Sequence, residues 1–193
     1  MPSSKTLCRN EIVTFPETNV PAELRKQVLR LHAEAWPDLE LHGHDPSLRP
    51  LSMLLLDEGR VVSALDILSK DIHHRREAYA ASGLSSVVTD PAQRNHGFGR
   101  HLVQTACEEI GRRRADLGLF TCDPSLQRFY EKAGWRRLSG TVLIGGTPDQ
   151  PLPSDRLGKI TMGHFYSARA SRDAQAFIGA RIELYPGEID KLW

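Results

Sequence analysis

The stretch Val87-Val88-Thr89-Asp90-Pro91-Ala92-Gln93-Arg94-Asn95-His96-Gly97-Phe98-Gly99-Arg100 decides the fold of this 193-residue chain. An apolar strand ends at Thr89, a short turn follows, and two glycines stand where a long amphipathic helix is expected to begin. Glycine lets a ligand approach the backbone closely, and the free N–H groups of a helix's first turn bind phosphate. The stretch therefore predicts an anion site between a strand and a helix.

Two better known phosphate motifs do not fit this stretch. No Gly-Lys-Ser/Thr follows the glycines, and the third glycine of a dinucleotide-binding fingerprint is missing. Arg94 and Arg100 add positive charge for the same anion. The pattern alone leaves open a second interpretation, in which Gly97 and Gly99 only shape a tight turn.

The flanking sequence predicts one mixed α/β domain over residues 1–193. Helical spacing of apolar residues predicts helices from Pro21 to just before Pro37, over 97–115, and through Phe129 to Ala133. A polar, basic connection is expected over 72–77 and a long exposed loop over 145–158. Apolar or β-branched runs predict strands over 11–15, 51–56, 61–68, 78–81, 84–89, 117–122, 137–144, 159–166 and 180–185.

Composition excludes several classes of protein. With 25 basic and 24 acidic residues, the chain has no charge excess that would favour nucleic acid or an anionic membrane. The N-terminal residues lack an apolar segment, so a cytoplasmic protein is expected. Its three cysteines fit neither a zinc site nor a disulfide framework. No metal is expected either, because His42, His44 and Asp45 are most simply interpreted as a solvated loop.

A second block supports a family resemblance. Arg94-x-x-Gly97-x-Gly99 resembles the pyrophosphate signature of the GNAT N-acetyltransferase superfamily, and Leu126-Gln127-Arg128-Phe129-Tyr130-Glu131-Lys132-Ala133-Gly134-Trp135 resembles its second hallmark. The resemblance implies a central mixed sheet splayed into a V, flanking helices and acetyl-CoA as the co-substrate. No nucleophilic residue is needed, because an amine attacks the thioester directly.

The resemblance also assigns roles to particular residues. The pyrophosphate is expected on the segment from Arg94 to Arg100, which comprises Arg94, Asn95, His96, Gly97, Phe98, Gly99 and Arg100. The pantetheine arm is expected along the strand Val87-Val88-Thr89, where a backbone amide can polarise the thioester carbonyl. Tyr130 is expected to protonate the departing thiolate.

The ends of the chain resemble aminoglycoside 2′-N-acetyltransferases, which implies an aminoglycoside acceptor and a role in antibiotic resistance. That resemblance implies an acceptor site with carboxylates from Asp38, Glu40, Glu188, Asp190 and the C-terminal Trp193, the last also helping to deprotonate the amine. By a gapless count, Ser85 stands where that group has a glutamate base. A serine cannot remove the proton alone, although it can relay one through water.

Several alternatives remain open at this point. The expected partner is a small-molecule amine acceptor. Instead of an aminoglycoside, it could be another small amine, a polyamine or a peptide N-terminus. Loss of the strand glutamate also leaves open a non-catalytic acyl-CoA-binding domain. A homodimer is compatible with the sequence, and neither nucleic acid nor a membrane is expected as a partner.

Overall fold

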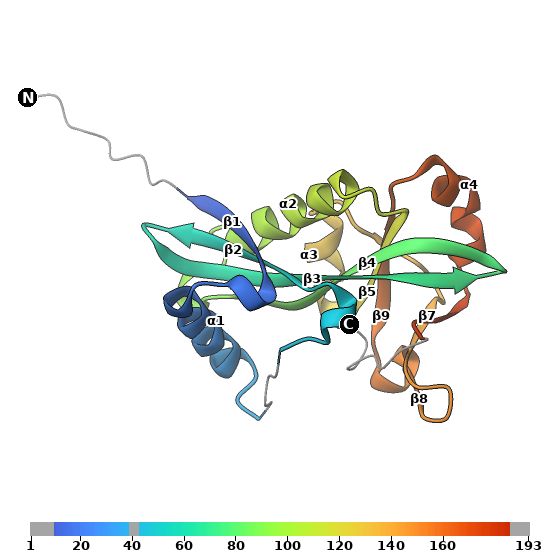
Figure 1. The fold of residues 1–193 in the computed structure, drawn as a ribbon, viewed down its shortest axis with the longest axis horizontal. Helices are drawn as coiled ribbons and strands as arrows, with labels where there is room; N and C mark the ends of the chain where they lie inside the picture. The colour runs from blue at the N-terminus through green and yellow to red at the C-terminus, as the bar shows by residue number, and fades with distance from the viewer. Residues whose placement is uncertain (1–9, 39–42, 186–193) are drawn as a thin grey trace, which may run out of the picture.

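A seven-stranded mixed sheet runs through the centre of the computed structural model, which describes residues 10–38 and 43–185 (Figure 1). Its strand order is β1-β2-β3-β4-β5-β9-β6, and a separate three-stranded sheet has the order β10-β7-β8. The large sheet comprises β1 (Glu11–Pro16), β2 (Leu51–Asp57), β3 (Arg60–His74), β4 (Glu77–Thr89), β5 (Leu117–Cys122), β9 (Ile160–Phe165) and β6 (Arg136–Arg137). The small sheet comprises β10 (Arg181–Glu183), β7 (Val142–Gly146) and β8 (Pro151–Pro153).

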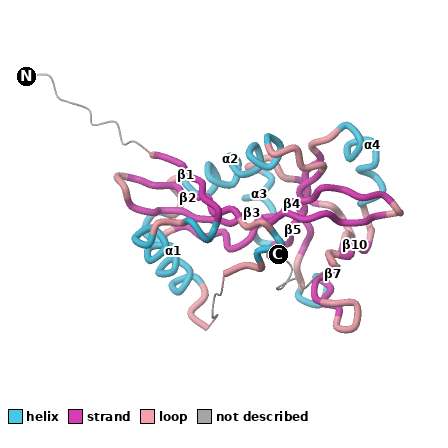
Figure 2. The backbone as a smooth tube through the Cα atoms, viewed as in Figure 1, coloured by secondary structure: helices cyan, strands magenta, loops and turns pink. Residues whose placement is uncertain are grey.

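Helices cover both faces of the large sheet (Figure 1). They are α1 (Ala22–Ala35), α2 (Phe98–Arg112), α3 (Gln127–Glu131) and α4 (Ala168–Phe177). Strand β3 contributes side chains to the hydrophobic core on each face of the sheet. Val61 and Ala64 belong to the core beneath α1, whereas Val62 and Leu65 belong to the core beneath α2. The small sheet and α4 share a third core with the far parts of β3, β4 and β5. Figure 2 shows β7 and β10 at the end of the molecule opposite α1.

Strands β4 and β5 separate soon after they meet. They pair in parallel only at Ala81↔Leu117 and Ser82↔Gly118, although β4 continues to Thr89 and β5 to Cys122. The ring of Trp135 lies over Gly118 at the last paired position, where an added Cβ would come within 2.6 Å of it. The predicted α/β fold, with its mixed sheet opened into a V and its flanking helices, is confirmed.

A β-bulge lies on the separated part of β4. The register with β3 moves from Ala64↔Val88 to Asp66↔Ser85, so that two residues of β4 oppose Leu65 alone. One of these two is Ser86, whose φ of 52° is in the left-handed region. The bulge therefore changes the direction of the β4 backbone in the region where β4 and β5 have separated.

Three predictions of local structure are wrong. Residues 72–77 are not a polar connection, because β3 and β4 are long strands joined by a two-residue turn. Both turn residues, Arg75 (φ 50°) and Arg76 (φ 70°), have the left-handed conformation that such hairpins require. The strand expected over 137–144 is split into β6 and β7 around Gly140, whose φ is 71°. The expected loop over 145–158 contains β8 and a 3-10 turn (Ser154–Leu157).

One helix has no counterpart among the predictions. Helix α4 begins after Ser167, whose hydroxyl accepts a hydrogen bond from the backbone N–H of Ala170 at 3.0 Å. A serine at this position followed by an alanine-rich segment is a recognisable helix start.

Within residues 10–38 and 43–185, none of the helices combines the length and the apolar character that spanning a bilayer requires. Cys107 and Cys122 are buried free thiols, and burial raises the pKa of both. Cys8 lies outside the described residues.

Candidate active site

The turn between β4 and α2 is anchored at Asp90. Its carboxylate accepts a hydrogen bond from the N–H of Ala92 at 2.9 Å and pairs with Arg60 at 2.7 Å. The chain then passes through left-handed conformations at Asn95 (φ 67°) and Gly97 (φ 87°) before α2 begins. Gly97 occupies the N-cap, so no side chain caps the first N–H groups of α2. This end of the helix has the backbone arrangement that the anion prediction requires.

The two glycines of the turn have different structural roles. A Cβ on Gly99 would come within 2.6 Å of the Thr89 hydroxyl, so glycine is needed there for close packing of α2 on β4. A Cβ on Gly97 would meet nothing within 4 Å, and glycine is favoured there by the positive φ. Both glycines therefore shape the turn, and the open space beside Gly97 is available to a ligand.

Most side chains of the predicted pyrophosphate segment are exposed. Arg94, Asn95, His96 and Arg100 are exposed, whereas Phe98 is half-buried and packs against the α2 core. Nδ1 of His96 lies 3.1 Å from the carbonyl oxygen of Arg94. The structure thus brings two exposed guanidinium groups to the uncapped end of α2, and their role in binding pyrophosphate remains a prediction.

The predicted pantetheine strand is fixed on its β3 side. The hydroxyl of Ser63 donates to the carbonyl of Val88 at 2.7 Å and lies 2.9 Å from the hydroxyl of Thr89. Val87 packs against the α2 core, and Val88 is buried on the opposite face. In the described structure, β4 has no paired strand on its β5 side beyond Ser82. The backbone of 87–89 is available there for a ligand.

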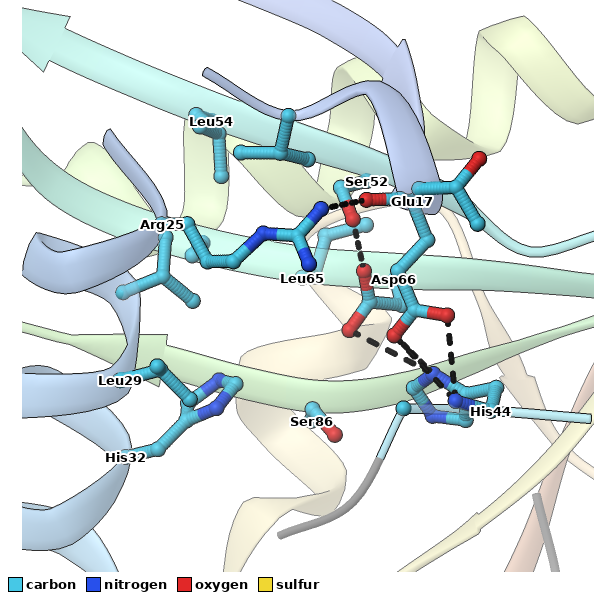
Figure 3. Close-up of a pocket in the computed structure, with 15 residues that line it drawn as sticks. Glu17, Arg25, Leu29, His32, His44, Ser52, Leu54, Leu65, Asp66 and Ser86 are labelled. Atoms are coloured by element: carbon cyan, nitrogen blue, oxygen red, sulfur yellow. Dashed lines mark hydrogen bonds and ion pairs between the residues drawn. The ribbon is translucent and has the colours of Figure 1, made fainter. Parts of the chain in front are cut away.

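A pocket of about 330 Å³ lies between α1 and the large sheet (Figure 3). One wall is apolar, and its side chains come from α1, the turn before it, β2 and β3: Val20, Val28, Leu29, Leu54, Ala64 and Leu65. At the other side, Glu17, His44 and Asp66 face one another (Figure 3). Ser86, at the β4 bulge, also lines the pocket, so the pocket reaches the separated part of β4.

Hydrogen bonds hold the polar side of the pocket together. Nδ1 of His44 lies 3.0 Å from Oε1 of Glu17, and Nε2 of His44 lies 3.0 Å from the Ser85 hydroxyl. The backbone N–H of His44 also donates to Glu17, at 3.1 Å. The Ser52 hydroxyl donates to Asp66 at 2.5 Å. His44 is therefore not part of a solvated loop, and that interpretation is wrong for this residue because its side chain is bonded on both ring nitrogens.

The pKa values of the two carboxyl groups in this cluster are shifted in opposite directions. Burial raises the pKa of Asp66 to about 6, an effect that the hydrogen bond from Ser52 only partly offsets. Burial also raises the pKa of Glu17, but the hydrogen bonds and charge of His44 outweigh burial and hold that pKa below its usual value. At neutral pH both groups are ionised, which favours a cationic ligand in the pocket.

Ligand atoms of Glu17, His44 and Asp66 all lie within 4.8 Å of one another, as a metal site would require. However, Glu17 and His44 are already within hydrogen-bonding distance, and Asp66 is bonded to Ser52. In the structure these contacts make the arrangement a hydrogen-bonded cluster, and the absence of a metal remains a prediction.

The predicted acid, Tyr130, is buried on α3. Its ring packs edge-on against Phe120 of β5 and Phe129. Burial, followed by the proximity of the ionisable groups of Cys122 and Asp123, raises the pKa of its hydroxyl. A raised pKa keeps the phenol protonated at neutral pH, which is the state a proton donor needs.

Most of the predicted acceptor residues lie outside the described part of the chain. Glu40, Glu188, Asp190 and Trp193 belong to the segments that the structure does not describe. Asp38 lies in an exposed turn just after α1 and is not among the described residues that line the pocket.

Sequence reasoning missed the residues that form the pocket's polar side. Glu17, His44 and Asp66 are not among the site residues predicted from the sequence, whereas Ser85, which is hydrogen-bonded to His44, is. The one usable signal was Asp66, a lone acid within the apolar run of β3.

A family model described as an acetyltransferase (GNAT) domain matches residues 19–138 of the chain. The chain belongs to the GNAT acetyltransferase family. Domains of this family use acetyl-CoA as a co-substrate. Membership of the family therefore supports transfer of an acyl group from acyl-CoA to an amine. No curated protein matches the chain in sequence.

Solved GNAT-like structures agree in fold. Escherichia coli ElaA is 16% identical, with 81% of this chain and 99% of that chain covered and a TM-score of 0.59. An acyl-CoA N-acyltransferase from Pseudomonas aeruginosa gives the same four values. A GCN5-related N-acetyltransferase from Anabaena variabilis is 18% identical, with 67% of this chain and 33% of that chain covered and a TM-score of 0.55. At these identities the likeness concerns the GNAT fold alone.

The exposed arginines at the start of α2 provide a test of the coenzyme site. We expect Arg94→Ala and Arg100→Ala each to weaken acetyl-CoA binding roughly 10-fold or more, because each removes a charge-assisted hydrogen bond worth about 1.5–3 kcal/mol. Calorimetric titration measures the effect. Arg112→Ala, at the opposite end of the same helix, is the matched control and should bind normally. Equal affinities in all three variants would contradict the assignment.

The raised pKa of Asp66 predicts a pH dependence of stability. Since the pKa is 3.8 ordinarily and about 6 in the folded protein, the folded state binds more protons between these values. The stabilisation by the protonated carboxyl is complete below about pH 4 and is lost as the pH rises through about 6. Asp66→Asn should therefore be more stable than the parent by about 2–3 kcal/mol at pH 8, and nearly equal at pH 3.5. Urea unfolding at both pH values measures this, and a constant difference would contradict it.

Proposed function

We propose that this protein transfers the acetyl group of acetyl-CoA to a primary amine that binds in the pocket between α1 and the large sheet. One observation carries the proposal. The pocket reaches Ser86 at the β4 bulge, on the part of β4 that has left β5. In the GNAT family that opening holds the coenzyme, so an amine in the pocket would lie beside the thioester.

The chemistry needs three contributions from the protein. The uncapped start of α2 and its arginines hold the pyrophosphate, and the backbone of 87–89 holds the pantetheine arm. A backbone N–H at the separated part of β4 polarises the thioester carbonyl as negative charge develops on its oxygen. The amine nitrogen attacks the carbonyl carbon, the C–S bond breaks, and Tyr130 donates a proton to the sulfur.

The lining of the pocket favours an amine attached to an apolar group. Glu17 and Asp66 supply negative charge at one side, where a cationic ammonium group would bind. The opposite wall is aliphatic, and Leu29 on that wall is 49% exposed, so it is available to cover a ligand. Alkyl and aryl amines, and peptides with an apolar N-terminal residue, combine these two features.

An aminoglycoside 2′-amine is the second candidate acceptor, in keeping with the resemblance at the ends of the chain. The observation in its favour is the pair of carboxylates, Glu17 and Asp66, in one pocket. Asp38, Glu40, Glu188, Asp190 and the Trp193 carboxylate would have to add further negative charge for a polycationic sugar. We also place the enzyme in the cytoplasm, since acetyl-CoA is available there.

A thiol-release assay tests the proposed function. Acetyl-CoA is offered with four groups of amines: alkyl and aryl amines, polyamines, peptides with free N-termini, and aminoglycosides. We expect turnover with a member of the first or third group, and mass spectrometry should show one acetyl group on its nitrogen. Turnover with aminoglycosides alone would replace the first candidate by the second. Tight binding of acetyl-CoA with no turnover on any amine would contradict catalysis and favour a non-catalytic acyl-CoA-binding domain.

Tyr130→Phe tests the proposed acid. A proton donor to the leaving thiolate acts in the transition state, so kcat should fall by about 100-fold while acetyl-CoA affinity stays within a factor of two or so. Phenylalanine retains the ring that packs against Phe120 and Phe129, so the fold should survive. Steady-state kinetics and calorimetry measure the two effects. An unchanged kcat would leave Tyr130 with a packing role only.

A further inference from the structure

Three side chains from separate segments form a chain of hydrogen bonds beside the pocket. Glu17 comes from the 3-10 turn after β1, His44 from the loop before β2, and Ser85 from β4. Oε1 of Glu17 lies 3.0 Å from Nδ1 of His44, and Nε2 of His44 lies 3.0 Å from the hydroxyl of Ser85. The residues are far apart in sequence, so only the fold brings them together.

The hydrogen bonds of Glu17 fix the proton positions in this chain. The pKa of Glu17 is lowered, and its ionised carboxylate can only accept hydrogen bonds. Nδ1 of His44 must therefore carry a proton and donate it to Glu17. In the neutral imidazole, Nε2 is then the acceptor nitrogen and accepts a hydrogen bond from the hydroxyl of Ser85. The hydroxyl of Ser85 also lies 3.5 Å from the hydroxyl of Ser86, which lines the pocket, so Ser85 can accept a further proton by way of Ser86.

We propose that His44 is the general base of acetyl transfer, that it acts through the hydroxyl of Ser85, and that Glu17 is its positioning residue. The proposal rests on the proposed function. One N–H bond of the substrate ammonium breaks and its proton goes to the hydroxyl of Ser86. The hydroxyl proton of Ser86 moves to Ser85, and that of Ser85 moves to Nε2 of His44. The products are a neutral amine and an imidazolium ion beside the Glu17 carboxylate.

The remaining protons of the reaction also balance. The neutral amine forms the new C–N bond, and the C–S bond breaks. The nitrogen then loses a second proton, which replaces the one that Tyr130 gives to the CoA sulfur. The imidazolium releases its proton to water, since His44 lines the pocket. Ser85 is not acylated at any stage.

Asp66 is the rival base, and its position argues against that role. Its Oδ1 accepts from Ser52, and its Oδ2 lies 4.0 Å from Nδ1 of His44, on the side of the ring away from Nε2. Ser85 therefore meets the nitrogen of His44 that is remote from Asp66. We assign Asp66 to attraction of the substrate cation.

Other titratable groups near His44 affect how the pH profile is interpreted. His32 of α1 also lines the pocket, and burial, with a smaller contribution from the charge of His44, lowers its pKa. Arg25 of α1 donates to the backbone carbonyl of Glu17 at 2.8 Å. The acidic limb of a kcat/KM profile could therefore reflect Asp66, His32 or His44, and variants are needed to separate them.

Kinetic pH profiles of four variants separate the candidates, with the amine identified by the thiol-release assay. His44→Gln should lower kcat/KM by roughly 100-fold or more at pH 7 and remove the acidic limb. Glu17→Gln should keep the limb but move it to lower pH by about one unit, because the carboxylate no longer stabilises the imidazolium. Asp66→Asn and the matched histidine control His32→Gln should both retain an acidic limb.

Variants of Ser85 test the bridging hydroxyl. Ser85→Ala should lower kcat with little change in KM, and Ser85→Thr, which keeps a hydroxyl, should recover most of the activity. Intact mass spectrometry after incubation with acetyl-CoA alone should show unmodified protein. An acetyl group on Ser85 would overturn the relay in favour of a covalent route, as would loss of the acidic limb in Asp66→Asn with its retention in His44→Gln.

A spectroscopic measurement tests the relay without any acceptor. Imidazole ¹⁵N NMR should show His44 protonated on Nδ1 when neutral, and Ser85→Ala should shift the Nε2 resonance. A neutral His44 protonated on Nε2 would overturn the proposal even in an active enzyme. Conversely, the expected tautomer in a protein that acetylates no amine would count against the proposed function rather than against the hydrogen-bonded chain. Loss of activity on chelation of metals would also overturn the proposal.

Discussion

The separation of β4 from β5 is the constraint on which the rest of the site depends. Two neighbouring parallel strands normally satisfy each other's backbone groups along their whole length. Here they pair at only two positions, and Trp135 lies over Gly118 where the pairing ends. The part of β4 that does not pair with β5 is followed by the turn to α2. At the bulge, the same part of β4 also lines the pocket beside α1. On the proposed function, the acetyl donor and the amine would meet at this strand.

The two halves of the site were predictable to different degrees. The segment from Val87 to Arg100 is continuous, and its strand, turn and helix start follow from local preferences and are present in the structure, whereas its role in binding the coenzyme remains a prediction. The polar side of the pocket depends on contacts between residues that are 27 and 41 positions apart. No local pattern encodes such contacts, since they arise only when the sheet is assembled.

The errors in secondary structure have a common physical origin. The hairpin at Arg75 and Arg76 uses left-handed conformations at two residues that rarely adopt them, so the sequence there lacks the usual Asn-Gly signal. Proline-rich residues 145–158 include a short strand because Pro151 and Pro153 bound an edge strand, a position that tolerates missing N–H donors. In both places tertiary pairing overrides the local preference.

The residues of the polar cluster lie at different places relative to the part of the chain that matches the family model. Glu17 precedes the part of the chain that matches the family model, which starts at residue 19, whereas Ser85 lies in its middle. The segment predicted to bind the coenzyme thus lies within one supersecondary unit, whereas Glu17 comes from the turn after β1 and His44 from the loop before β2. On the proposed function, a change in these edge turns would alter which amine is accepted and leave the segment proposed to hold the co-substrate unchanged.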